Sequence, residues 1–579
     1  MAEMILPGTY IEVRPEGLIV PGQISVGNLG VVGTASKGET DKPVLVSSYA
    51  DAVQIFGPYD SFIDPATGAR RQDNETPPKP NELTLVRALE QAFAFGATSV
   101  FAVRVAGSSQ AKASYTLLKG TSKIALLEAK TPGKWGNDLQ VNVSAAEEGA
   151  FIEKENVTVG DPPAPKLKFP PTASARNRIV HTSALTGIQT SFSGDKVIHT
   201  GTPADDQVKI DPANSNVTFG SKITLAKEDT VVATYVVDKA SSRKVTVRLG
   251  TTDEVYTVVS GTDLIGDITA QSTLVNASAP STAQPPFTPG ELPDASVPST
   301  GFANFKGGAN GSSGANYEAG LDLLLNEDAH IIVAAGQDDS FGNALDKHCQ
   351  KASTDVIKRD RIAVVGSKPQ GNPNDFFDYL RGHNLSSDRV IFVAPGIKVQ
   401  DSGATPRAEV ILPGAYAAAA FAGLLSSFSP HISPTNKVIP VDGLERVFTA
   451  PELTQLVQRG ILLIEKRQGF RIVRGITTQP PGSAFAQITT RRIVDYAKYG
   501  VRSAATPYIG LLNNERVRGA LRATINSFLA EMVNDEMLVS YELNVSATRD
   551  EERKGIARVV MTLRPTFSID FIKVTMFLE

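Results

Sequence analysis

The spacing of apolar positions divides the chain into an α/β frame and a region of different character. Residues 26–106 and 301–460 alternate short apolar runs, such as 330–335, 361–366 and 390–395, with segments of helical periodicity. Buried parallel strands joined by helices have this pattern. We therefore expect one α/β domain whose sequence is split into two parts.

The region between these parts, residues 107–300, resembles a β-rich insertion. Segments 140–144, 222–225, 231–237 and 244–249 alternate like half-buried strands, and convincing helical periodicity is absent. Residues 278–299 contain six prolines, which indicates a linker. We expect one or two inserted outer domains.

The last part of the chain, residues 461–579, predicts an α+β domain. A hairpin over 461–477 precedes helices over 491–505 and 515–533, and strands follow over 538–545 and 556–563. Asn513 or Asn514 can cap the second helix. The predicted fold is thus multidomain, α/β and α+β, with a β-rich insertion.

Both ends of the chain are predicted to be extended arms. Residues 1–25 hold a short strand over 9–14, and the prolines and glycines after it prevent a prompt hairpin. At the other end, residues 567–579 alternate, but the apolar phase shifts between Phe571 and Ile572. A long apolar strand must pair with something. It pairs either within its own domain or with a sheet in another subunit, and composition leaves both possibilities open.

Composition and charge exclude several classes of protein. Of the 579 residues 41% are apolar, and the net charge is −4, so a nucleic-acid coat protein with a basic surplus is excluded. One cysteine, Cys349, excludes an intramolecular disulfide and a cysteine-rich zinc site. The longest apolar run, 415–425, is too short to span a bilayer, and we expect a small-residue helix packed close to a neighbour. Residues 1–10 predict no signal peptide.

Searches for chemical motifs predict no catalytic, cofactor or metal site. The sequence has no GxxxxGK[ST], HExxH or GxSxG motif, and no two of its histidines are four residues apart. His348 and Cys349 are adjacent and diverge by about 100° on a helix, so we expect a buried structural cysteine rather than a dyad.

Several short segments together resemble one family. Leu6–Val13, with the sequence Leu-Pro-Gly-Thr-Tyr-Ile-Glu-Val, resembles the opening of contractile tail sheath proteins. The other similar segments lie in the same order along the chain: Lys42–Val46, Phe56–Gly57, Leu412–Gly423, Arg471–Thr478, Ile488–Tyr496 and Asn513–Asn514. The resemblance covers residues 1–106 and 301–579, whereas the middle third matches no part of the family.

The resemblance implies a structural subunit that forms stacked hexameric rings around an inner tube and contracts to drive the tube through a target envelope. It implies terminal arms that add strands to neighbouring subunits, through Tyr10, Ile11, Glu12 and Val13 at one end and Phe571, Ile572, Lys573 and Val574 at the other. We expect Arg518 and Arg522 to face the tube.

The implied partners are further copies of the chain, an inner tube protein, and baseplate and tail terminator or cap proteins. Direct nucleic-acid contact and membrane insertion are not expected. Assembly in the bacterial cytoplasm, into a phage tail or a bacterial contractile injection particle, follows from the same resemblance.

Two other classes of protein remain as alternatives. An α/β hydrolase-like enzyme with a β-rich insertion would need a nucleophile and a base, and no such pair is recognisable. A surface adhesin or coat-forming protein would normally carry an export signal.

Overall fold

The computed structural model describes residues 27–58, 83–160, 164–280, 288, 290–294, 301–312, 314–401 and 408–577. Two compact units contain them: one within residues 1–35, 39–107 and 312–579, and a second within 36–38 and 108–311. The expected multidomain α/β and α+β fold with a β-rich insertion is confirmed.

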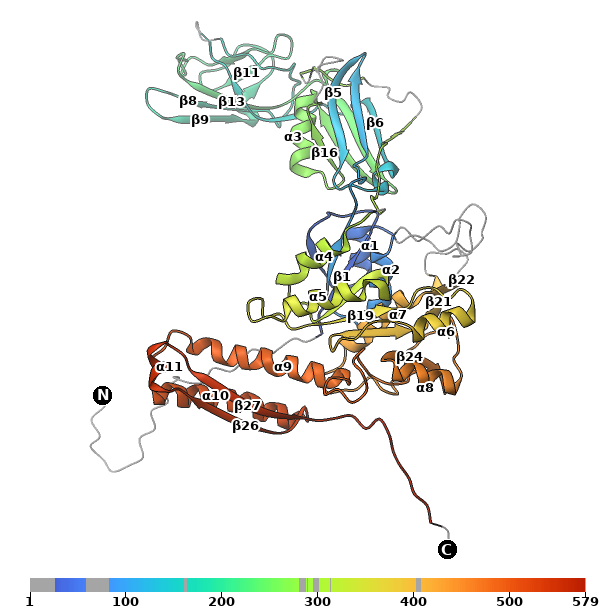
Figure 1. The fold of residues 1–579 in the computed structure, drawn as a ribbon. Helices are drawn as coiled ribbons and strands as arrows, with labels where there is room; N and C mark the ends of the chain where they lie inside the picture. Colours follow the sequence, from blue (N-terminus) through green and yellow to red (C-terminus); the bar gives the residue numbers. More distant parts are fainter. Residues whose placement is uncertain are drawn as a thin grey trace, which may run out of the picture. The chain divides into compact units, whose positions relative to one another are not determined.

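The first unit is built on an eight-stranded sheet (Figure 1). Its inner strands run parallel, and the two edge strands, β2 and β25, are antiparallel to their neighbours. In spatial order the strands are β2 (Pro43–Val46), β3 (Val100–Arg104), β1 (Leu29–Gly33), β18 (Ile331–Asp338), β19 (Ile362–Gly366), β20 (Val390–Ala394), β24 (Ile461–Lys466) and β25 (Phe470–Ile472).

Helices cover both faces of this sheet and form two separate apolar cores. Neighbouring residues of one strand enter different cores, as Val31 and Val32 do. One face packs against α1 (Tyr49–Phe56), α2 (Leu85–Ala94) and α7 (Gly414–Ser426). The other face packs against α4 (Tyr317–Leu323), α5 (Gly342–Ala352), α6 (Pro373–Arg381) and α8 (Ala450–Gln458). The unit's core therefore has three layers, with the sheet in the middle.

The alanine-rich helix α7 is the small-residue helix that the sequence predicted. Almost all of its residues are buried, and it packs on α2 and on the middle of the sheet. At Gly423 an added Cβ would stand 2.2 Å from the carbonyl oxygen of Ala92 in α2. The two helices thus approach so closely that only glycine fits there. Beside α7 lies a small sheet of β21 (Ile397–Asp401), β22 (Ala408–Leu412) and β23 (Gly443–Leu444).

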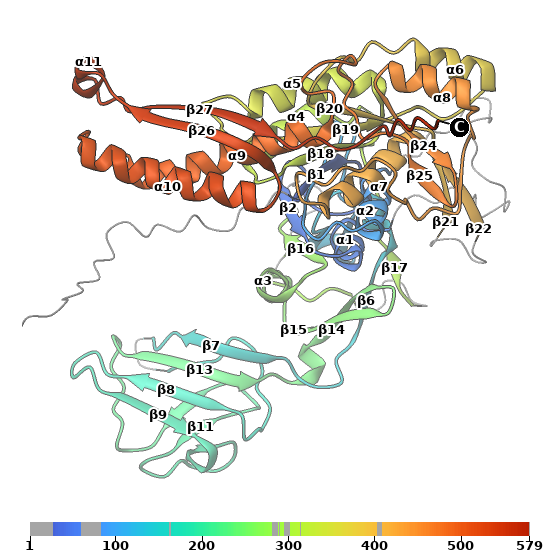
Figure 2. The ribbon, with the colours of Figure 1, turned by 90° about the horizontal axis from the view of Figure 1, so that it is seen from below.

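The C-terminal part of the first unit is a pair of long helices with a hairpin (Figure 2). These elements are α9 (Ile488–Ala505), α10 (Glu515–Asn534), β26 (Leu538–Ser546), α11 (Arg549–Arg553) and β27 (Arg558–Pro565). Leu521, Ile525, Phe528 and Met532 of α10 are buried. The short helix α11 was not predicted. Residues 461–466 were expected in this domain, but as β24 they pair with β20 of the large sheet.

The second unit contains two apolar cores of its own. The first core lies among β4 (Ser114–Lys119), β5 (Ser122–Ala129), β6 (Leu139–Ala145), β14 (Arg243–Leu249), β15 (Thr252–Val258), β16 (Val275–Ser278), β17 (Ala303–Asn304) and α3 (Gly261–Gln271). The second lies among β7 (Phe151–Val157), β8 (Arg178–Thr182), β9 (Gln189–Ser193), β10 (Val197–Ile198), β11 (Val208–Ile210), β12 (Val217–Phe219) and β13 (Thr230–Val236).

Three of the four strands that the sequence singled out here are confirmed as β6, β13 and β14. The strand expected over 222–225 was wrong, because these residues lie in a turn and coil, and helix α3 was missed. The first and last segments of the unit run antiparallel to each other. Ala111 and Ala309 exchange two backbone hydrogen bonds of 3.1 and 3.0 Å, and Ser114 pairs with Lys306 in the same way.

Candidate assembly interface

The hairpin of β26 and β27 is a two-stranded sheet. Its inner face, which includes Tyr541, Leu543 and Val559, packs on the core between α9 and α10. Neither outer edge is paired with another strand in the described part of the chain. Since an unpaired edge presents backbone donors and acceptors, this hairpin can accept further strands.

The chain after this hairpin is extended and exposed. Among residues 566–577 the structure shows no helix and no paired strand, and the segment leaves the body of its unit (Figure 1). Its large apolar side chains are 62–88% exposed: Phe567, Ile569, Phe571, Ile572, Val574, Met576 and Phe577. Of the predicted strand-donating residues, Phe571, Ile572, Lys573 and Val574 all lie in this segment and are exposed. The described residues thus contain an apolar strand-forming segment without a sheet.

The side chain of Asp570 attaches this segment to the body of the unit. The carboxylate of Asp570 accepts hydrogen bonds from Arg474 Nε at 2.8 Å and from Gln487 Nε2 at 3.2 Å. The Asp570 side chain is only 7% exposed, in contrast to the apolar side chains on either side.

The four residues predicted at the other arm, Tyr10, Ile11, Glu12 and Val13, lie outside the described residues. Their role in strand donation stays a prediction.

The two arginines expected to face a tube differ in their surroundings. Helix α10 begins after Asn514, whose side chain accepts a hydrogen bond from the Val517 amide. Arg518 donates to Glu552 of α11 at 3.0 Å and is half-buried. Arg522, one turn later, is exposed. Because Glu552 already partners Arg518, Arg522 is the better candidate for an intermolecular contact.

A group of buried charges attaches α9 to the large sheet. Asp360 lies two residues before β19. Its side chain is 3% exposed and pairs with Lys498 and Arg502 of α9 and with Arg389 before β20. Asp495 of α9 accepts hydrogen bonds from Arg389 at 2.8 Å and from Arg491 at 2.6 Å. This carboxylate pair therefore links α9 to two neighbouring strands.

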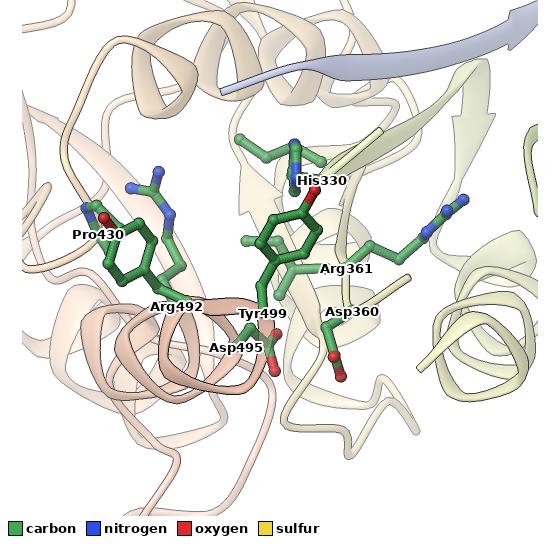
Figure 3. Close-up of a pocket in the computed structure, with 10 residues that line it drawn as sticks. His330, Asp360, Arg361, Pro430, Arg492, Asp495 and Tyr499 are labelled. Carbon is green, nitrogen blue, oxygen red and sulfur yellow. The ribbon is translucent and has the colours of Figure 1, made fainter. Parts of the chain in front are cut away.

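The same region encloses a small cavity in which a histidine is kept neutral. Figure 3 shows Arg361 and Arg492 extending to opposite sides of it, with His330 and Tyr499 between them. Burial, and then the charges of Arg361 and Arg492, lower the pKa of His330 to about 4. Burial and the neighbouring Arg361 lower the pKa of His348 to about 3. Both arginines donate to backbone carbonyls, Arg492 to that of Phe428 and Arg361 to that of Leu324.

We expect the first unit to lose stability in mild acid because of these two histidines. A histidine in the unfolded chain has a pKa of about 6.5, so below that pH the unfolded chain binds more protons and is favoured. Lowering the pH from 7.5 to 5.5 should cost about 1.4 kcal/mol per histidine. Chemical denaturation at both pH values measures the loss, and in His330→Gln/His348→Gln it should shrink. An unchanged pH dependence in that variant would contradict the assignment.

Other chemistry is sparse in the part of the chain that the structure describes. There, no group of three His, Cys, Asp or Glu side chains could hold a metal ion, and no helix is long and apolar enough to cross a membrane. Cys349 is fully buried, and burial raises the pKa of its thiol to about 12, which confirms the structural role expected for it.

Comparison with known proteins finds tail sheath domains in the second half of the chain. The model of the phage tail sheath protein central domain matches residues 310–478, and that of the phage tail sheath C-terminal domain matches residues 481–579. This part of the chain is thus similar to contractile tail sheath proteins. The second model takes in α9, α10, the hairpin and the exposed segment after it.

An individual relative agrees with this similarity. A tail sheath protein of Staphylococcus phage Twort is 30% identical over 187 residues, which are 31% of this chain and 30% of that protein. The chain thus matches less than a third of the length of that curated relative.

Two solved sheath tail proteins have a similar fold. The one from Desulfitobacterium hafniense aligns with 96% of this chain and 100% of its own, with a TM-score of 0.56 and 14% identity. The one from Listeria innocua aligns with 94% of this chain and 96% of its own, with a TM-score of 0.54 and 13% identity.

Proposed function

We propose that this chain is the structural subunit of a contractile tail sheath. Its copies assemble as stacked hexameric rings around an inner tube, and contraction of the rings drives the tube through a target envelope. The two sheath-domain matches support this function. The proposal includes no catalytic step.

The exposed apolar segment beside an open hairpin is the observation that supports polymerisation most directly. Seven consecutive residues, 571–577, are all exposed. The edges of β26 and β27 lie open in the described residues of the same chain. A segment of one copy can add to the hairpin of the next by backbone hydrogen bonds. Head-to-tail donation that does not close into a ring produces an open helical array.

The remaining parts of the proposal follow from the family and the sequence. The N-terminal arm, residues 1–25 with Tyr10 to Val13, donates a second strand, and Arg522 contacts the inner tube. The proposed partners are the tube protein, a baseplate, and a terminator or cap protein. Assembly takes place in the bacterial cytoplasm, and the product is a phage tail or a bacterial injection particle.

Removing the segment tests this function. A chain that ends at Asp570 should fold but form no tubes, because it keeps the hairpin and lacks the donated strand. Negative-stain microscopy shows the tubes, and circular dichroism with size-exclusion chromatography checks the fold. Deleting residues 1–22 should have the same effect.

The control variant changes an exposed apolar side chain elsewhere. Leu185, which is 93% exposed in the second unit, can be replaced by serine, and Leu185→Ser should assemble like the unaltered chain. Tubes of normal length from the chain ending at Asp570 would overturn the proposed function.

A further inference from the structure

The terminal segment is attached to the body of its unit at Asp570 and is exposed beyond that residue. Asp570 accepts hydrogen bonds from three parts of the unit: Arg474 after β25, Gln487 before α9, and Thr435 Oγ1 at 3.3 Å. The Thr435 hydroxyl also accepts the Gly475 amide at 2.9 Å, so the site that receives Asp570 is itself ordered.

This contact does not come from apolar burial. Ile569 and Phe571, on either side of Asp570, are 80% and 79% exposed, whereas the carboxylate is almost completely buried. The Arg474 guanidinium also lies over the Phe571 ring, 5.2 Å from its centre. A single polar side chain, that of Asp570, therefore attaches the segment to the body of the unit.

The next attachment toward the hairpin lies at Thr566. Its amide donates to the carbonyl of Met537 at 3.1 Å, next to the start of β26. The segment between Thr566 and Asp570 belongs to no helix or strand. It is thus a short connection held at both ends.

We propose that Asp570 is a latch that sets how much of the terminal arm is available to a neighbouring copy. This inference rests on the proposed function. With the latch closed, the free arm begins at Phe571, and with the latch open it begins after Thr566. The four residues gained lengthen the free arm by up to about 13 Å, at roughly 3.3 Å per residue. A sheath whose subunits change their spacing can keep its donated strands paired by opening this latch.

The latch itself is tested on single copies, without polymerisation. Ile569→Cys, at an exposed position between the attachments at Thr566 and Asp570, provides the only reactive thiol for a spin label among the residues described, because Cys349 is buried and its thiol pKa is raised to about 12. The label should be restrained in the otherwise unaltered chain and at least twice as mobile when Asp570→Ala is added. Arg474→Gln removes the other partner of the ion pair and should likewise make the label more mobile. The double exchange Asp570→Arg/Arg474→Asp should restrain the label again.

Ser568→Ala is the matched control. Ser568 Oγ donates to the Asp570 carboxylate at 3.3 Å, and no hydrogen bond joins its hydroxyl to the body among the described residues, so this variant should leave the label restrained. A label equally mobile with and without Asp570 would overturn the latch.

Assembled tubes test the reach of the arm. Tubes of Asp570→Ala should form, with an axial repeat that is longer or more variable than normal when measured by cryo-electron microscopy. An unchanged repeat despite a mobile arm would overturn the proposed control of reach. Tubes formed by the chain that ends at Asp570 would instead overturn the proposed function, so the two failures are distinguishable.

Discussion

Asp360→Asn should lower the free energy needed to detach α9 from the large sheet by about 3 kcal/mol. Removing one partner from a buried ion pair leaves the other charges less well compensated. Here Arg389, Lys498 and Arg502 all lose a carboxylate, although Arg389 keeps its pairing with Asp495. Lys498 and Arg502 are partly exposed, which keeps the cost at the lower end of the usual range for buried pairs. Hydrogen exchange of the α9 amides measures the effect, and about 3 kcal/mol corresponds to roughly a hundredfold faster exchange.

Asp355→Asn is the matched control for this effect. Asp355 lies 3.6 Å from Arg502 but is fully exposed, so water screens its charge. Its removal should leave the exchange of α9 unchanged. Equal acceleration in both variants would show that the buried position of Asp360 has no special role.

Gly423→Ala should destabilise the first unit by about 3 kcal/mol, the upper part of the range for overpacked cores. The new methyl group would stand 2.2 Å from the Ala92 carbonyl oxygen. Backbone atoms in a packed helix pair cannot move aside as a flexible side chain can, so α2 and α7 must separate. Denaturant unfolding followed by tyrosine fluorescence, or hydrogen exchange of α2, measures the loss.

A second glycine in a helix serves as the control. Gly519 of α10 is exposed, and an added Cβ there would meet no atom within 4 Å. Gly519→Ala should therefore stabilise α10 by about 0.5–1 kcal/mol, since alanine is the better helix former. Destabilisation of similar size in both variants would contradict the close approach of α2 and α7.

The elements predicted correctly are those whose signal lies within one short segment. Most side chains of the alanine-rich run at 415–425 are small, so a helix formed from it can pack closely against its neighbours, and α7 is buried almost completely. Helix α3 was missed because only Leu264 and Ile268 mark its apolar face, although Ser260 caps it by accepting the Asp263 amide. The turn with Gly469 predicts the hairpin of β24 and β25, which is present, while the parallel pairing of β24 with β20 of the large sheet leaves no mark in the local pattern.

The candidate interface was predictable only in part, for a similar reason. The apolar alternation after Pro565 predicts a strand in need of a partner, but the pattern of one chain cannot show which molecule supplies the sheet. Asp570 had a recognisable signal, a single carboxylate between apolar residues, and this signal was not used. Its partner Arg474 is 96 residues earlier in the sequence, and the partners of Asp360 in α9 are 138 and 142 residues later. Such pairs become visible only when the chain is folded.

The pairing of Ala111 with Ala309 places the two ends of the segment between them side by side. Two residues that exchange both backbone hydrogen bonds have Cα atoms about 5.5 Å apart, a gap that a two-residue turn closes. All eight strands of the large sheet lie outside the stretch between them. Residues 112–308 are therefore an insertion with adjacent ends. Recombination can delete it, or replace it with another domain whose ends lie close together, without changing how the strands of the large sheet are connected.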